Sequence, residues 1–176
     1  DNVLVTREEI AAAVDKLGEQ ITADYQGKEL LLVGILKGSV VFFSDLMRSI
    51  DLPVKTEFMA VSSYGAATKT SGVVNLVKDL TVDITGMHVL IVEDIVDSGM
   101  TLSYLKKYLS TRGAASIKIA TLLDKPERRR VDLKADYFCF TIPDEFVVGY
   151  GLDYAEKYRN LPDIGVLSPR IYAGKE

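Results

Sequence analysis

The sequence predicts an α/β fold in which a mostly parallel sheet is flanked by helices. Short apolar runs of strand length alternate with segments whose apolar residues recur at helical spacing. The chain has 176 residues and 48% hydrophobic content, which is enough for one ordinary core. No internal repeat, low-complexity linker or boundary is visible, so we expect a single domain spanning residues 1–176.

The first helix is predicted from a capping box. Thr6 and Glu9 have the required spacing, and apolar residues follow at helical spacing from Ile10 to Ile21. Gly27 would end this helix. The continuous apolar run Leu30–Leu36 then predicts a buried strand.

The next segments alternate in the same way. Residues 37–39 interrupt the apolar pattern, and residues 40–50 read as a helix. Strands are expected at residues 54–61 and 73–77. Between them, residues 62–72 are rich in small and polar side chains without an apolar period, which predicts a mobile loop.

The second half of the chain repeats the alternation. A strand is expected at residues 89–93, followed by a helix at 101–111 that Gly113 would stop. Further strands are expected at residues 117–123 and 137–142.

Composition disfavours several classes of protein. The chain has 21 basic and 25 acidic residues, a net charge of −4, which argues against a general affinity for nucleic acid. Its one cysteine, Cys139, excludes an internal disulfide and suits a cytoplasmic protein. No apolar stretch approaches the roughly 18–20 residues of a membrane span, and no signal peptide is visible. Because the chain begins at Asp1 rather than Met, that last absence is weaker evidence.

The segment VLIVEDIVDSGMTL, residues 89–102, is the most informative. An apolar strand ends in Glu93 and Asp94, then Asp97 precedes a small polar loop and a helix. Ligands of open α/β sheets lie beyond the carboxyl ends of strands. Acids suit sugar hydroxyls and Mg²⁺, and the N–H groups of a helix start suit a phosphate. A phosphorylated sugar carries both groups: hydroxyls for the acidic side chains and a phosphate for the helix start.

Two alternatives are open on these residues alone. The three acids could be solvated loop carboxylates, which are common. Receiver domains of response regulators also contain a strand that ends in an acidic pair. They place it near their own N-terminus, whereas Glu93 and Asp94 come halfway along this chain, and the loop at residues 97–101 has no role in such a fold.

The segment EDIVDSGMTL resembles the phosphoribosyl pyrophosphate (PRPP) signature of type I phosphoribosyltransferases. Three further segments make the chain similar to hypoxanthine-guanine phosphoribosyltransferases, notably the bacterial branch: LKGS at 36–39, SSYG at 62–65 and IPDEFVVGYGLDYAEKYRNLP at 142–162. They fall in the family's order and span nearly the whole chain. The resemblance implies the family's fold, with a small hood formed by the terminal segments. It also implies Mg²⁺-dependent transfer of phosphoribose from PRPP to N9 of hypoxanthine or guanine, giving IMP or GMP and pyrophosphate.

The resemblance assigns the PRPP site to the acidic segment. Glu93 and Asp94 would engage the ribose hydroxyls and Mg²⁺, directly or through water. The 5′-phosphate would lie among the loop residues Asp97, Ser98, Gly99, Met100 and Thr101. Met100 would contribute only its amide, because its side chain cannot donate a hydrogen bond.

Asp97 would be the catalytic base, taking the proton from purine N7 as N9 attacks. Aspartate is ordinarily ionised at neutral pH and can accept a proton. The plainer alternative is that Asp97 only caps the following helix.

The resemblance assigns pyrophosphate to Lys37, Gly38 and Arg159, with a cis peptide between Leu36 and Lys37. The alternative for this loop is an ordinary strand-to-helix turn. Ser63 and Tyr64 would belong to a lid, residues 62–72, that closes over the reacting centre and excludes water.

The purine would be bound by the last segment. Phe146 would stack on the base and Val147 would offer backbone groups, although composition alone favours a plain core strand for residues 146–148. Lys125 would bind O6 and favour 6-oxopurines over adenine. Asp153 would be a second Mg²⁺ ligand.

The basic run at residues 127–130 reads as a solvated loop for Arg128 and Arg130, with Arg129 as a candidate to reach the active site. A PRPP-sensing regulator that binds RNA or DNA is the competing function. The acidic charge and the intact Lys125, Phe146 and Asp153 argue against it. The sequence itself does not give the oligomeric state; the resemblance implies a homo-oligomer, dimer or tetramer, with residues 40–50 as a possible interface. The sequence does not rank hypoxanthine, guanine and xanthine.

Overall fold

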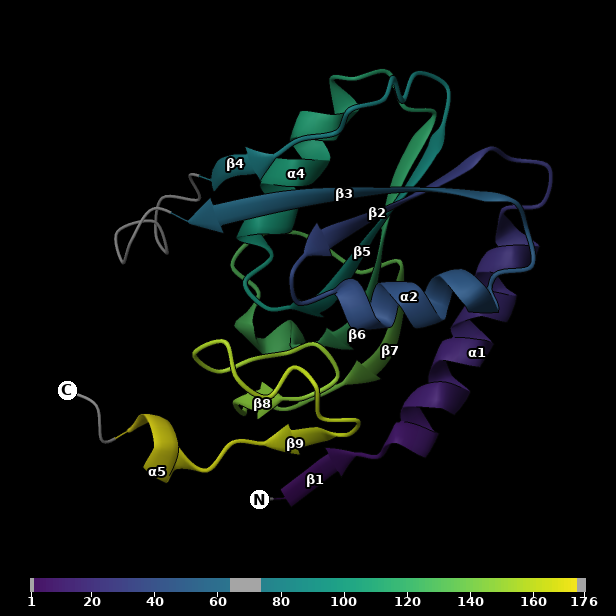
Figure 1. Ribbon diagram of the computed structural model, residues 1–176. Coiled ribbons are helices and arrows are strands. Elements are labelled where there is room, and N and C mark those ends of the chain that lie inside the picture. The colour runs from purple at the N-terminus through teal and green to yellow at the C-terminus, as the bar shows by residue number, and fades with distance from the viewer. Residues whose placement is uncertain (1, 64–73, 174–176) are drawn as a thin grey trace.

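The main sheet has the predicted α/β architecture. The computed structural model describes residues 2–63 and 74–173 (Figure 1). Six strands lie in the order β4-β3-β2-β5-β6-β7, and all neighbours are parallel except β3 and β4. The strands are β2 (Leu30–Leu36), β3 (Val54–Ser63), β4 (Val74–Lys78), β5 (His88–Val96), β6 (Ser116–Asp124) and β7 (Tyr137–Thr141).

Helices cover both faces of this sheet, so β2 is apolar throughout and the middle of β5 is a continuous apolar run. Leu30 and Leu32 of β2 pack in the cluster that contains helices α1 (Arg7–Asp24) and α2 (Val40–Ser49). Leu31 and Val33 point to the other face and join the cluster that contains α4 (Met100–Ser110). The alternation of strand side chains between the two faces produces these two cores.

Helix α1 begins at the predicted capping box. The Thr6 hydroxyl accepts a hydrogen bond from the Glu9 amide at 3.2 Å, and the Glu9 carboxylate accepts one from the Thr6 amide at 3.2 Å. The helix ends at Asp24, and Gly27 follows with a φ of +74°.

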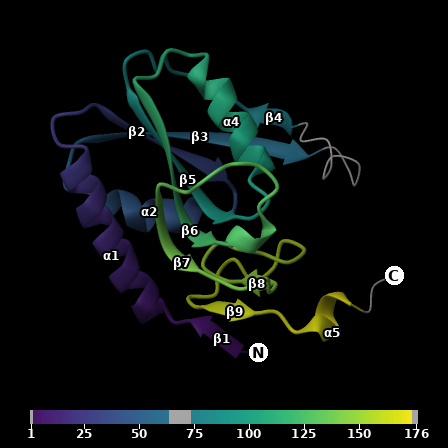
Figure 2. The ribbon, with the colours of Figure 1, turned by 180° about the vertical axis from the view of Figure 1, so that it is seen from behind.

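A second, three-stranded antiparallel sheet forms the hood. Its order is β1-β9-β8, with β1 (Asn2–Val5), β9 (Ile164–Val166) and β8 (Val147–Val148), and the short helix α5 (Pro169–Tyr172) follows. Figures 1 and 2 show β1 and β9 side by side below the main sheet. Segments from both ends of the described chain therefore build the hood, which confirms the expectation drawn from the resemblance.

Some element boundaries differ from the prediction. Strand β5 does not end at Glu93: it continues through Asp94 to Val96, because Glu93 pairs with Thr121 and Val96 with Asp124 of β6. The main chain of β6 thus overrides the low strand propensity of acidic residues. Strand β3 likewise runs to Ser63, into the predicted loop, and most of that loop lies outside the described residues.

Candidate functional site

The loop predicted to bind the 5′-phosphate, called the phosphate loop below, connects the end of β5 at Val96 to the start of α4 at Met100. It lies at the carboxyl edge of the sheet. Residues of this segment line a cavity of about 180 Å³, namely Glu93, Asp94, Ile95, Val96, Asp97, Ser98, Gly99, Thr101 and Leu102. Gly99 is the N-cap of α4 and has a φ of +81°, a conformation that side chains other than glycine rarely adopt. The Ser98 hydroxyl accepts from the Met100 amide at 3.3 Å. The Asp97 side chain is therefore not the cap of this helix.

Glu93 and Asp94 are consecutive residues in the second half of β5, and both carry carboxylates. The Glu93 carboxylate accepts from the Asp94 amide at 3.0 Å, and the Asp94 carboxylate accepts from the Ile95 amide at 2.7 Å. Burial, and then the nearby charge of Asp94, raise the pKa of Glu93 well above its usual range. A cation bound beside the two carboxylates would offset both the cost of burying the Glu93 charge and its repulsion from Asp94.

The loop after β2 lies directly against Asp94. The peptide between Leu36 and Lys37 is cis, as predicted. A Cβ atom at Gly38 would come within 2.8 Å of Asp94 Cγ, and one at Gly151 within 2.5 Å of the Gly38 carbonyl oxygen. The two glycines therefore let this loop lie between Asp94 and the segment at Gly151.

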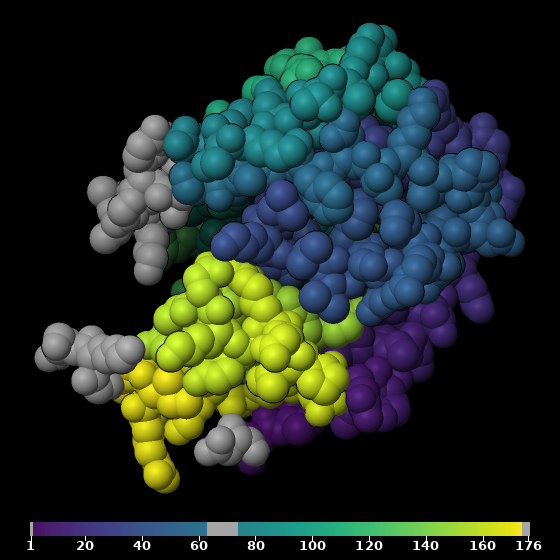
Figure 3. Space-filling model, in the orientation of Figure 1, coloured from purple at the N-terminus to yellow at the C-terminus, as the bar shows by residue number. Residues whose placement is uncertain are grey.

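A larger cavity of about 520 Å³ brings the donor and base segments together. Its walls are formed by Asp94, Ile95, Asp97, Lys125, Arg128, Asp144, Glu145, Phe146, Val147, Leu152, Asp153 and Tyr172. All four residues predicted to bind the purine line it, together with Asp94 and Asp97. Figure 3 shows a hollow between the yellow-green hood and the main sheet above it.

Lys125 presents a buried cation to this cavity. The residue is 7% exposed and follows the last residue of β6. Its ammonium donates to the Glu145 carbonyl at 2.6 Å and lies 3.8 Å from a carboxylate oxygen of Asp144. One wall of the cavity is thus fixed as a hydrogen-bond donor.

Arg128 bridges two carboxylates across the same cavity. Its Nε lies 2.9 Å from Asp97 Oδ1, and its Nη1 lies 3.0 Å from Asp144 Oδ1. Hydrogen bonding and the charge of Asp144 and Asp97 raise the pKa of Arg128, and the guanidinium lowers the pKa of Asp144. Arg128 is exposed, as expected for a solvated loop residue, but it also forms ion pairs with two carboxylates that line the cavity. Its position three residues after Lys125 was the available signal.

Arg129 contacts the backbone at the start of the phosphate loop. Its guanidinium donates to the Asp97 carbonyl at 3.1 Å and to the Leu133 carbonyl at 2.8 Å, and pairs with Asp124 at 2.7 Å. The Arg130 amide donates to the Ser98 carbonyl at 2.9 Å. Arg129 therefore contacts the loop backbone rather than the cavity.

Arg159 contacts the segment that carries Asp153. It donates to the Gly151 carbonyl at 2.7 Å, and its Nη2 lies 3.4 Å from Asp153 Oδ1 and 3.3 Å from Glu156 Oε1. Lys37 pairs with the same Glu156 at 3.2 Å. Both residues predicted to contact pyrophosphate through side chains are thus tied to the segment 151–159.

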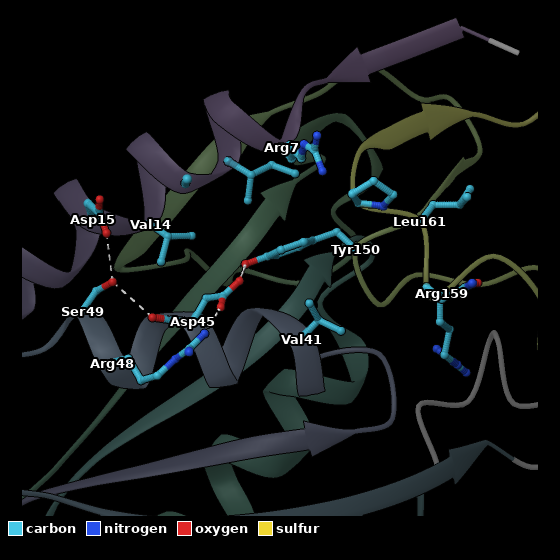
Figure 4. Close-up of a pocket in the computed structure, with 14 residues that line it drawn as sticks. Arg7, Val14, Asp15, Val41, Asp45, Arg48, Ser49, Tyr150, Arg159 and Leu161 are labelled. Atoms are coloured by element: carbon cyan, nitrogen blue, oxygen red, sulfur yellow. Dashed lines mark hydrogen bonds and ion pairs between the residues drawn. The ribbon is translucent and has the colours of Figure 1, made fainter.

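Arg159 also lines a cavity of about 600 Å³ between α1, α2 and residues 150–162. Figure 4 shows Tyr150 pointing toward Asp45 of α2, to which it donates a hydrogen bond, and Ser49 pointing toward Asp15 of α1. Among the residues predicted for the site, this cavity includes only Arg159. Although larger, it is not the place where the predicted residues gather.

Two predictions concern the metal and the lid. In the described part of the chain, no group of three or more acidic, histidine or cysteine side chains forms a metal site. Glu93, Asp94 and Asp153 are thus not gathered around one point. Ser63 is the last residue of β3, and Tyr64 lies outside the described residues.

The fold and the site define a class of protein. The family model described as "Phosphoribosyl transferase domain" matches residues 4–155. The chain therefore belongs to the phosphoribosyltransferases.

Relatives of nearly equal length narrow this class to the hypoxanthine-guanine phosphoribosyltransferase branch, which consists of enzymes. The one from Streptococcus pneumoniae is 58% identical over 171 residues, covering 97% of this chain and 95% of that protein. The one from Bacillus subtilis is 53% identical over 98% of this chain and 96% of its own length. A crystal structure of a hypoxanthine phosphoribosyltransferase from Staphylococcus aureus, 52% identical, superposes with a TM-score of 0.95 over 98% of this chain and 94% of that one. None of the helices in residues 2–63 and 74–173 has the length and apolar content to cross a membrane.

Proposed function

We propose that the protein salvages purines by transferring the 5-phosphoribosyl group of PRPP to N9 of hypoxanthine or guanine, with release of pyrophosphate. One observation carries this proposal. The cavity of about 520 Å³ joins Asp94 and Asp97, from the PRPP motif, to Lys125 and Phe146, from the base segment. Donor and acceptor can therefore meet in one space.

The donor is bound from the sheet edge. Glu93 and Asp94 accept from the ribose hydroxyls, and the amides and hydroxyls from Ser98 to Thr101 hold the 5′-phosphate at the start of α4. The loop at Lys37 and Gly38 binds pyrophosphate, with Arg159 as a further contact. The close approach of Gly38 to Asp94 supports this arrangement, because pyrophosphate and ribose are joined in PRPP and their proposed contacts are neighbours here.

The acceptor is oriented by the opposite wall. Lys125 donates to O6 of the purine, Phe146 stacks on the ring, and Val147 offers backbone groups to its edge. The Lys125 ammonium can only donate, so it offers a hydrogen bond to the O6 of a 6-oxopurine, whereas the 6-amino group of adenine would face it as a second donor. The pocket therefore favours a 6-oxopurine.

Asp97 accepts the N7 proton as the bond from N9 to C1 of the ribose forms. In the ligand-free protein its carboxylate is paired with Arg128. The incoming base must therefore displace or share this ion pair. The lid that contains Ser63 and Tyr64 then keeps water from the cation-like sugar.

The donor set suits Mg²⁺. Glu93, Asp94 and Asp153 offer carboxylate oxygens, and Mg²⁺ commonly takes one or two protein carboxylates and completes its shell with water and phosphate oxygens. A bound Mg²⁺ would neutralise charge on the departing pyrophosphate. The raised pKa of Glu93 is consistent with a carboxyl pair that is incomplete without a cation.

The direct test is an assay with PRPP, Mg²⁺ and one base at a time: hypoxanthine, guanine, xanthine or adenine. Nucleotide and pyrophosphate are expected in equal amounts with hypoxanthine or guanine. No product with any base would contradict the proposal. A cytoplasmic location and a dimer or tetramer are part of it, and fractionation and analytical ultracentrifugation test them.

A further inference from the structure

Three aromatic rings gather where the hood meets the base cavity. The rings of Phe146 and Tyr172 are stacked, with centroids 5.3 Å apart and planes tilted by 29°. Tyr154 stands edge-on to Phe146 at 5.7 Å, and lies 6.5 Å from Tyr172. Phe146 and Tyr172 line the cavity, and Tyr154 is not among the lining residues. The proposed function assigns no role to Tyr172.

Core packing does not fix the Phe146 ring. Phe146 is 40% exposed, whereas Val147 and Val148 immediately after it are each 5% exposed. The exposed ring needs neighbours outside the core to hold one orientation, and the ring stacked on it is that of Tyr172, itself 36% exposed. Aromatic pairs of this kind contribute about 0.5–1.5 kcal/mol beyond the area they bury.

The backbone fixes Tyr172 relative to Phe146. The Leu167 amide donates to the Phe146 carbonyl at 2.8 Å, just before α5 begins. The Ser168 hydroxyl caps that short helix by accepting from the Arg170 amide at 3.4 Å. The Tyr154 hydroxyl donates to the Ile171 carbonyl at 3.5 Å. Helix α5 is thus tied to Phe146 before its first residue and to Tyr154 near its last.

One of the two tyrosine rings is stacked on Phe146 and the other is not. Tyr172 is stacked at 5.3 Å, whereas Tyr154 stands edge-on, and the nearly equilateral triangle of centroids shows that the two tyrosines do not lie on opposite sides of the Phe146 centroid. The face of Phe146 opposite Tyr172 therefore has no stacked tyrosine. A planar base can stack there while Tyr172 supports the ring from its other face.

We propose that Tyr172 is a positioning residue for purine binding, which holds the Phe146 ring in the orientation in which it stacks on the base. This inference rests on the proposed function, because it assumes that Phe146 faces a purine. The orientation of Phe146 depends on the aromatic ring of Tyr172 and not on the Tyr172 hydroxyl. Loss of the ring weakens base binding and leaves PRPP binding and the catalytic group in place.

The test compares Tyr172→Ala and Tyr172→Phe in the full chain. With PRPP saturating, Tyr172→Ala is expected to raise KM for hypoxanthine or guanine about 3- to 10-fold, the equivalent of the ring-pair energy. Its KM for PRPP and its kcat stay within about twofold of the parent. Tyr172→Phe restores the parental KM for the base. Ile171→Ala is the matched control, since Ile171 is equally exposed at 37%, is on the same helix and does not line this cavity.

The outcomes separate this inference from the function beneath it. A parent enzyme that makes no nucleotide would contradict the proposed function. With an active parent, an unchanged base KM in Tyr172→Ala would overturn the inference alone. A lowered base KM would also overturn it, because the ring would then occupy the place of the purine. An equal rise in both KM values, or an equal effect of Ile171→Ala, would show a general disturbance of the hood and overturn it too.

Discussion

The backbone of Gly38 lies directly against the carboxylate of Asp94. A side chain at Gly38 would overlap that carboxylate, which the Ile95 amide holds in place at 2.7 Å. On its other side, the loop is confined by Gly151, whose added Cβ would come within 2.5 Å of the Gly38 carbonyl oxygen. The loop after β2 is therefore packed between Asp94 of β5 and the segment at Gly151, at the proposed reaction centre.

Gly38→Ala is expected to lower kcat/KM by about 10- to 100-fold, because displacement of a positioning group by about 1 Å can cost that much. Steady-state kinetics with both substrates measures it. Gly27→Ala is the control: Gly27 has a φ of +74° and nothing within 4 Å of an added Cβ, so only local backbone strain is introduced. Parental activity in Gly38→Ala would refute the positioning argument.

Asp97→Asn should lower kcat by about 10²–10⁴-fold while the fold and PRPP binding remain, since an amide cannot take the N7 proton. Asp144→Asn breaks the other end of the Arg128 bridge and should lower kcat far less. Single-turnover kinetics and calorimetric PRPP titration compare the two. Unchanged turnover in Asp97→Asn would remove Asp97 from the mechanism.

Lys125→Met should lower kcat/KM for hypoxanthine about 10- to 100-fold, the loss of one charged hydrogen bond. The ratio of hypoxanthine to adenine turnover should narrow, because the donor that selects O6 is gone. Lys55→Met is the control, since Lys55 is an exposed partner of Glu29 at the start of β3. If the ratio holds in Lys125→Met, base selection lies elsewhere.

Glu93→Gln should stabilise the ligand-free protein at pH 7–8 by about 0.5–2 kcal/mol, although it should impair activity. Burial and Asp94 raise the pKa of Glu93, so the folded protein holds this proton more tightly than the unfolded chain. The stability that protonation supplies is present at low pH and lost as pH rises. The gain from Gln should therefore shrink on acidification. Urea unfolding at several pH values tests this, with Glu19→Gln on the exposed face of α1 as control.

Cys139 should resist alkylation in the folded protein. Burial in β7 raises the pKa of its thiol to about 12, and only the thiolate is nucleophilic. Iodoacetamide at pH 8 should therefore react slowly with native protein and rapidly in urea, as mass spectrometry would show. Rapid reaction of the native protein would mean that the thiol is neither buried nor suppressed.

The sequence predicted the donor side of the site well because its residues are contiguous. One strand, one loop and one helix start carry Glu93 through Thr101, so their proximity follows from local structure. The capping box at Thr6 was also predictable from a short segment, whereas the cis peptide after Leu36 was expected only from the family resemblance. The chemical roles of these residues stay predictions.

The acceptor side depended on tertiary structure. Arg128 faces Asp97 only because a turn after β6 brings it across the cavity, and Tyr172 meets Phe146 only because β8 and β9 pair. Strands of two and three residues have too little pattern to be recognised. The extension of β5 past Glu93 was also missed, because its pairing with β6 decides where this strand ends.

The pairing of β1 with β9 has a consequence for synthesis. A ribosome delivers β1 first, but its partner is residues 164–166, so that strand has an open edge until almost all the described chain has emerged. The proposed phosphate-binding residues 97–101 are synthesised well before residues 147–172, which form the proposed base-binding wall. Closure of the hood, which needs β9 to pair with both β1 and β8, is therefore expected to be a late step of folding.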